Sequence, residues 1–158
     1  MLHLMRGLGG IWTLVIFAVT TMPWSNFKGH AHWSSVHWIP FLDFSFTVAF
    51  VADLVGNLLL FVPFGFCFVA ASSPLNSRRV TKIVLSALVL SVAVELFQSF
   101  GHNRIASMTD VCTNVAGALV GAKVALRWRS IGMLRDARGL DQRSALETQR
   151  SDISLPID

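Results

Sequence analysis

The side chains that could do chemistry gather in one short stretch of the chain. It holds two acids, a base and two amides, namely Glu95, Gln98, Arg104, Asp110 and Asn114. Strongly apolar segments flank it on both sides. An ionisable side chain at the centre of a membrane helix costs about 2.5–3.5 kcal/mol on insertion scales, so it usually faces a polar cavity or a partner. Paired carboxylates beside an arginine suit either acid–base catalysis or the binding of a polar head group.

The rest of the chain has the composition of an integral membrane protein. Of its 158 residues 53% are hydrophobic and only 14% are charged, which is too apolar for an ordinary soluble domain. A transmembrane helix needs about 20 mostly apolar residues, and four stretches approach that length, at 7–24, 48–71, 80–100 and 110–126. The exit of the first lacks a small-x-small cleavage pattern, so we interpret it as an uncleaved helix. The sequence predicts an all-α, polytopic membrane protein with four transmembrane helices.

The distribution of Lys and Arg predicts that both termini are cytoplasmic. With that orientation, all but two of the 13 basic residues, Lys28 and Arg104, fall on the cytoplasmic side. Helix ends and anionic lipids then account for the basic composition, and no nucleic acid is expected as a partner. Residues 1–126 would form the membrane domain. Residues 127–158, which mix Arg with Asp and Glu, would form a cytoplasmic tail that is partly disordered.

The first loop, at 25–47, is rich in tryptophan and histidine. It carries Trp33, Trp38, His30, His32 and His37. The spacing of the histidines matches none of the tight structural zinc patterns, whereas Trp collects at membrane–water interfaces. We therefore expect an interfacial loop on the outer side, with no metal and no cofactor.

A second polar pair lies on the second predicted helix. Asp53 and Asn57 are four residues apart and share one helix face. In the predicted topology the outer half of the membrane holds Asp53, Asn57, Glu95, Gln98, Arg104, Asp110 and Asn114. Polar side chains that only join neighbouring helices would lie at many different depths in the membrane. The pattern therefore favours one polar pocket that opens to the outer leaflet, with Arg104 balancing the negative charge of a carboxylate. A structural hydrogen-bond network between the helices is the alternative.

The order of these motifs resembles a known family. The run from Asn57 through Pro63 to Gly65, then Glu95-x-x-Gln98, Arg104 and Asp110-x-x-x-Asn114-x-x-Gly117, is similar to the pattern of the VanZ-like family of bacterial membrane proteins. Trp38-Ile-Pro40-Phe41 resembles the apolar-Pro-Phe element of that family, although His37 stands where many relatives would have Asn. The likeness covers about 37–123. It implies a multi-pass protein of the bacterial inner membrane and cell envelope, in a family named for a protein associated with resistance to teicoplanin.

Three functions stay open at this point. In the first, the pocket binds a lipid-linked or cell-wall-related ligand without catalysis. Its ligand-binding residues would be Asp53, Asn57, Gln98, Arg104 and Asn114, with Arg104 on an anionic head group. In the second, the protein is an intramembrane enzyme acting on a lipid phosphate or ester. Glu95 and Asp110 would then be the catalytic acid and base, with Arg104 stabilising negative charge.

The third function is proton-coupled transport, with the protein acting as a small transporter. Four helices without an internal repeat make a poor transporter unless the protein oligomerises, so this alternative ranks last. Gly117-x-x-x-Gly121 suits either a homo-oligomer contact or close packing within one chain. The expected partners are membrane lipids and a lipid-linked envelope precursor.

Overall fold

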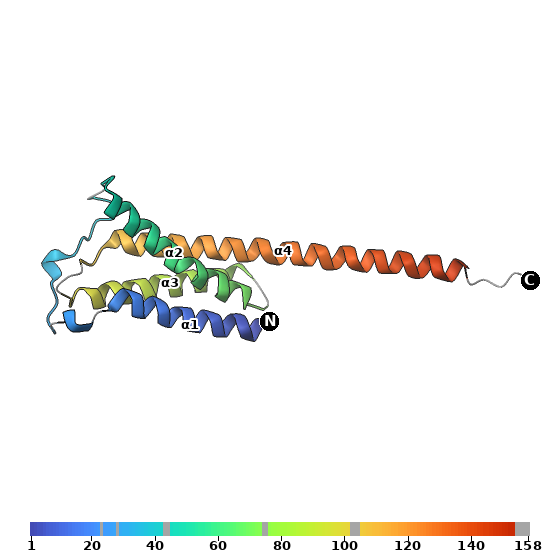
Figure 1. Ribbon diagram of the computed structural model, residues 1–158, viewed down its shortest axis with the longest axis horizontal. Helices are drawn as coiled ribbons and strands as arrows, with labels where there is room; N and C mark the ends of the chain where they lie inside the picture. Colours follow the sequence, from blue (N-terminus) through green and yellow to red (C-terminus); the bar gives the residue numbers. More distant parts are fainter. Residues whose placement is uncertain (23, 28, 43–44, 74–75, 102–104, 154–158) are drawn as a thin grey trace, which may run out of the picture. The chain divides into compact units, whose positions relative to one another are not determined.

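The computed structural model describes residues 1–22, 24–27, 29–42, 45–73, 76–101 and 105–153. These residues form four α-helices, shown in Figure 1: α1 (Leu2–Thr21), α2 (Val48–Ala70), α3 (Ser77–Gln98) and α4 (Met108–Ile153). Short 3-10 turns at Trp24–Asn26 and Trp33–Ser35 lie between α1 and α2. The all-α prediction is confirmed over this part of the chain. Three of the helices, α1, α2 and α3, are long and apolar enough to cross a membrane.

The helix boundaries differ most from the predicted ones at the end of α4. We expected a helix over 110–126 followed by a tail, and α4 continues to Ile153. The chain divides into two compact units, Met1–Ala125 and Leu126–Asp158. The first contains α1, α2, α3 and the beginning of α4, and the second is helical as far as Ile153. Partial disorder of the tail stays a prediction.

The helices of the first unit begin and end where local chemistry allows. The Thr47 hydroxyl accepts a hydrogen bond from the Phe50 amide at the start of α2, and the Asn76 side chain does the same for Arg79 at the start of α3. The helix α1 ends at Thr21, and Met22 is extended with φ −79° and ψ 152°. That conformation is the one favoured for a residue before proline.

Glycines bring α2 and α4 into backbone contact. A Cβ on Gly65 of α2 would overlap the backbone of Ala118, and Cβ atoms on Gly117 and Gly121 would overlap the carbonyl oxygens of Leu58 and Val62. The Gly-x-x-x-Gly motif of α4 is therefore used for packing inside one chain. A core joins all four helices around this contact, formed by Ile16, Phe61, Phe64, Ala87 and Ala118.

The first loop is tied to the turn between α3 and α4. The His32 amide donates to the Ser99 carbonyl at 2.8 Å, and the His37 amide donates to the Ala106 carbonyl at 2.9 Å. The Met108 amide returns a bond to the His37 carbonyl at 3.0 Å. Figure 1 shows both connections at the same end of the bundle. These bonds hold the loop against the start of α4.

The α2–α4 contact gives a stability test. Replacing Gly121 by Ala places a Cβ against the backbone of Val62, and we expect a loss of about 1–3 kcal/mol, the usual cost of overpacking. Gly10→Ala on α1 is the matched control, because a Cβ there meets nothing within 4 Å. Removing a helical glycine should then stabilise by about 0.5–1 kcal/mol. In detergent, the melting temperature should therefore fall for Gly121→Ala and rise for Gly10→Ala. An unchanged melting temperature of Gly121→Ala would contradict the close contact between α2 and α4.

Candidate functional site

A cavity of about 480 Å³ lies between the helices of the first unit. Its wall is formed by Val19, Thr20, Ala52, Asp53, Gly56, Asn57, Leu60, Gln98, Ile105 and Asp110. The volume is within the range of about 300–1,000 Å³ that is common for small-molecule sites. Four of the seven polar residues singled out in the sequence line it: Asp53, Asn57, Gln98 and Asp110.

The first half of α2 supplies half of the cavity wall. Asp53, Asn57 and Leu60 recur at intervals of four and three residues and form one row along the helix. Ala52 and Gly56 form the neighbouring row. Leu60 is the last lining residue in this row, and its carbonyl accepts a hydrogen bond of 2.7 Å from the indole Nε1 of Trp12 on α1. This bond ties α1 to α2 three residues before Pro63, which lies inside α2 and cannot donate a backbone hydrogen bond.

Gln98 connects the cavity to α1. Its side chain is buried, and Nε2 donates to the Thr20 carbonyl at 3.1 Å. The Thr20 hydroxyl in turn donates to the Ile16 carbonyl at 2.7 Å within α1. Our sequence analysis assigned no site residue to α1, although Thr20 and Val19 line the cavity. Two adjacent threonines at the end of an apolar helix were the available signal.

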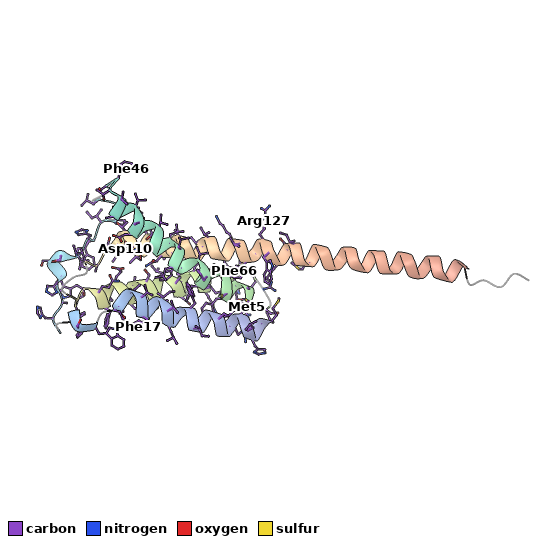
Figure 2. The ribbon with its side chains drawn as sticks, viewed as in Figure 1. Met5, Phe17, Phe46, Phe66, Asp110 and Arg127 are labelled. Carbon is purple, nitrogen blue, oxygen red and sulfur yellow. The ribbon has the colours of Figure 1, made fainter. Side chains whose placement is uncertain are left out.

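Asp110 enters the cavity wall from the first turn of α4. Ser107 precedes this helix, and its carbonyl accepts from the amides of Asp110 and Val111 at 3.1 and 3.3 Å. Its hydroxyl accepts from the Thr109 amide at 3.2 Å, as a helix-capping serine does. Figure 2 labels Asp110 near the start of α4. A carboxylate at this place is stabilised by the positive end of the helix dipole.

Glu95 takes a different position from the one we expected. It is 4% exposed, and its Oε2 accepts a hydrogen bond of 2.7 Å from the Ser107 amide. In a capping box that amide would donate to the acid three residues on, here Asp110. Glu95 borders a small, mostly apolar cavity with Trp33 and Trp38 instead of the large one. The carboxylate of Glu95 therefore anchors the start of α4 from α3.

Asn114 also lies away from the large cavity. It is 1% exposed, and its Nδ2 donates to the Ser91 hydroxyl at 2.9 Å, which links α4 to α3. Its Oδ1 has no hydrogen-bond partner among the described residues. Sequence analysis did not identify Ser91 as its partner. Arg104, the remaining site residue of the prediction, lies outside the described residues.

A second cavity, of about 150 Å³, adjoins the first along one wall. Asp53, Ile105 and Asp110 line both cavities, and the smaller one adds His37, Phe50, Leu54, Ser107 and Thr109. Both carboxylates thus face space on two sides. Ionised carboxylates and amide oxygens accept several hydrogen bonds, so this wall suits a group rich in hydroxyl or N–H donors. Within the described ranges, no three or more His, Cys, Asp or Glu side chains are grouped so as to hold a metal ion.

Comparison with known proteins places this arrangement in a family. The family model VanZ/LLP1 matches residues 8–129, which include most of α1, all of α2 and α3, the beginning of α4 and the residues that line the 480 and 150 Å³ cavities. Comparisons with curated proteins and with solved structures give no match. Because the family model covers most of the chain, this helical membrane protein belongs to the VanZ/LLP1 family.

Proposed function

We propose that this protein binds the polar head of a lipid-linked or cell-wall-related ligand in the 480 Å³ cavity. The observation that carries the proposal is the gathering of Asp53, Asn57, Gln98 and Asp110 around one space. These side chains come from three helices, two of which are long and apolar enough to cross a membrane. Polar and ionisable groups are costly in such helices unless they face a cavity or a partner, so a site for a polar ligand accounts for their position.

The proposal includes a topology. The helices α1, α2 and α3 and the beginning of α4 would form four spans, with both termini in the cytoplasm of a bacterium and the cavity toward the outer leaflet. The asymmetry of Lys and Arg supports this orientation. The contacts of Gly117 and Gly121 with α2 support a fourth span, because they pack the beginning of α4 along a membrane-length helix.

Cysteine labelling tests the topology. In a chain with Cys67 and Cys112 replaced by Ala, we expect Ser34→Cys in the first loop to react with a membrane-impermeant maleimide in intact cells. Ser73→Cys, between α2 and α3, is the matched control. Both serines are exposed, so Ser73→Cys should react only after the membrane is opened. Labelling of Ser73→Cys in intact cells would show that the orientation is the opposite of the proposed one.

The side chains that line the cavity limit the chemical class of the ligand. Two carboxylates and two carboxamides recognise hydroxyl and N–H groups by direct hydrogen bonds. We propose Arg104, whose neighbour Ile105 lines the cavity, as the residue that meets an anionic part of the head. A lipid-linked envelope precursor combines these features. A role in teicoplanin resistance is a further proposal that rests on the family alone, and a homo-oligomeric state stays untested, since Gly117 and Gly121 are used for packing within the chain.

Lipid mass spectrometry on the purified protein tests the binding site. We expect the wild type to retain one lipid above the bulk population, and Asp110→Asn and Arg104→Ala to lose it. A hydrogen bond to a charged group contributes about 1.5–3 kcal/mol, so retention should fall by roughly tenfold or more. Ser86→Ala is the control, because its exposed hydroxyl bonds only within α3, to the Lys82 carbonyl. Identical bulk lipids on every variant would remove the support for a ligand site.

The enzymatic alternative requires two acids that face one reacting group. Asp110 lines the large cavity, whereas Glu95 borders another cavity and holds the Ser107 amide. Because Glu95 is engaged in holding the start of α4 and does not line the large cavity, we rank binding ahead of catalysis by the Glu95–Asp110 pair. Transport stays last, because nothing in the described part of the chain adds support to it.

Substitutions of Glu95 can distinguish a structural role at the start of α4 from a catalytic role. Glu95→Gln keeps an oxygen for the Ser107 amide and removes the charge, so we expect a lower melting temperature, corresponding to about 1 kcal/mol or more, with lipid retention preserved. Glu95→Ala should destabilise further, because it leaves the amide unpaired. Thermal unfolding and lipid mass spectrometry measure both effects. Unchanged stability of Glu95→Gln, together with loss of any turnover of the retained lipid, would instead assign Glu95 to catalysis.

A further inference from the structure

The residues that line the large cavity are more buried on its inner side than at its outer edge. On the inside, Gln98 and Thr20 are buried, and Asn57 and Leu60 are half-buried. On the outside, Ala52 and Gly56 of α2 are exposed, and Val19 of α1 is 57% exposed. The outer edge thus includes small or apolar side chains from two neighbouring helices, together with Asp53, which is also exposed. The amide groups of Asn57 and Gln98 lie behind them.

The helices α1 and α2 separate at the level of this edge. They are joined at Trp12 and Leu60 by the indole–carbonyl bond. Toward the beginning of α2 the two helices diverge, as Figure 1 shows. Gly56 lies one turn beyond Leu60 in that direction, and a Cβ on it would meet nothing within 4 Å. Gly65, Gly117 and Gly121 meet backbone, so Gly56 is a glycine that faces open space instead of a helix contact.

The surface next to the edge is apolar. On α2, Val51, Val55 and Leu59 are 43%, 48% and 59% exposed. These residues belong to a helix long and apolar enough to cross a membrane, so in a bilayer they would face hydrocarbon chains. An open cavity edge bordered by such side chains leads directly from lipid to the polar wall.

We propose that Val19, Ala52 and Gly56 form a lateral portal through which a lipid ligand enters from the bilayer. The head, rich in hydroxyl groups, lies on Asp53, Asn57, Gln98 and Asp110, and the hydrocarbon tail passes between α1 and α2 and lies along Val55 and Leu59. This inference rests on the proposed function and extends it. It names a membrane-embedded glycolipid, delivered sideways, as the ligand class rather than a water-soluble sugar.

Filling the portal tests this inference. Gly56→Leu places a side chain at the edge, in open space, and should leave the fold intact. Gly10→Leu is the matched control, since Gly10 is also an exposed α-helical glycine with nothing within 4 Å of a Cβ. Each variant is reconstituted in nanodiscs that contain a glucosyl diacylglycerol, and native mass spectrometry measures the retained glycolipid. Saturation-transfer NMR with methyl glucoside measures binding of a head without a tail. Melting temperatures check the fold of each variant.

The expected result is a selective loss. Gly56→Leu should retain glycolipid roughly tenfold less than the wild type, because the added side chain overlaps the tail, and its methyl glucoside signal should fall much less, although Gly56 also borders the cavity. Gly10→Leu should behave as the wild type with both probes. Full glycolipid retention by Gly56→Leu would overturn the portal and leave the head site standing, and an equal loss of both probes would show that Gly56 acts only through the head site and would also overturn the portal. A wild type that holds neither probe would overturn the proposed function itself.

Discussion

The backbone contact between α2 and α4 is the constraint on which the rest of this structure depends. It needs glycine at three positions, because Gly65, Gly117 and Gly121 each face a backbone atom of the opposite helix. Leu58 meets Gly117 at one end of the contact. Asp53 lies about 7.5 Å before Leu58 along α2, and Asp110 about 10 Å before Gly117 along α4, at 1.5 Å per residue. The contact therefore brings both carboxylates to the same end of the helix pair, where they line common cavities.

The polar side chains of the first unit divide into two groups: those that make hydrogen bonds to another part of the chain, and those that line the cavity. Glu95, Gln98 and Asn114 are buried, and each makes a hydrogen bond to another part of the chain: to the Ser107 amide, the Thr20 carbonyl and the Ser91 hydroxyl. Asp53, Asn57 and Asp110 are less buried and line the cavity. Gln98 belongs to both groups. A membrane fold uses polar groups both as helix contacts and as functional groups, and in the function proposed here both uses would occur within a few turns of helix.

The proposed site and its portal follow from one feature of packing. Where the Trp12 indole donates to the Leu60 carbonyl, α1 and α2 are in direct contact. Where they diverge, the small residues Ala52 and Gly56 leave the edge open while Asp53 and Asn57 supply the polar wall. In this proposal, neighbouring rows of residues on α2 would carry the entrance and the binding groups. With such a portal, a lipid ligand would keep its tail in the hydrocarbon of the bilayer while its head lay in the polar cavity.

Sequence alone determined the elements and their composition. Apolar runs of the right length predicted the helices, proline and capping residues explain several of their boundaries, and the family resemblance is confirmed over 8–129. The sequence also predicted that the polar residues gather at one end of the bundle. It did not show that α1 contributes Val19 and Thr20 to the cavity, or that α4 continues to Ile153. Tertiary structure decided which polar side chains face the cavity. Residues at the same depth, such as Glu95 and Asp110, can point into different spaces, because each residue turns the helix by about 100° and only packing against neighbours sets that rotation.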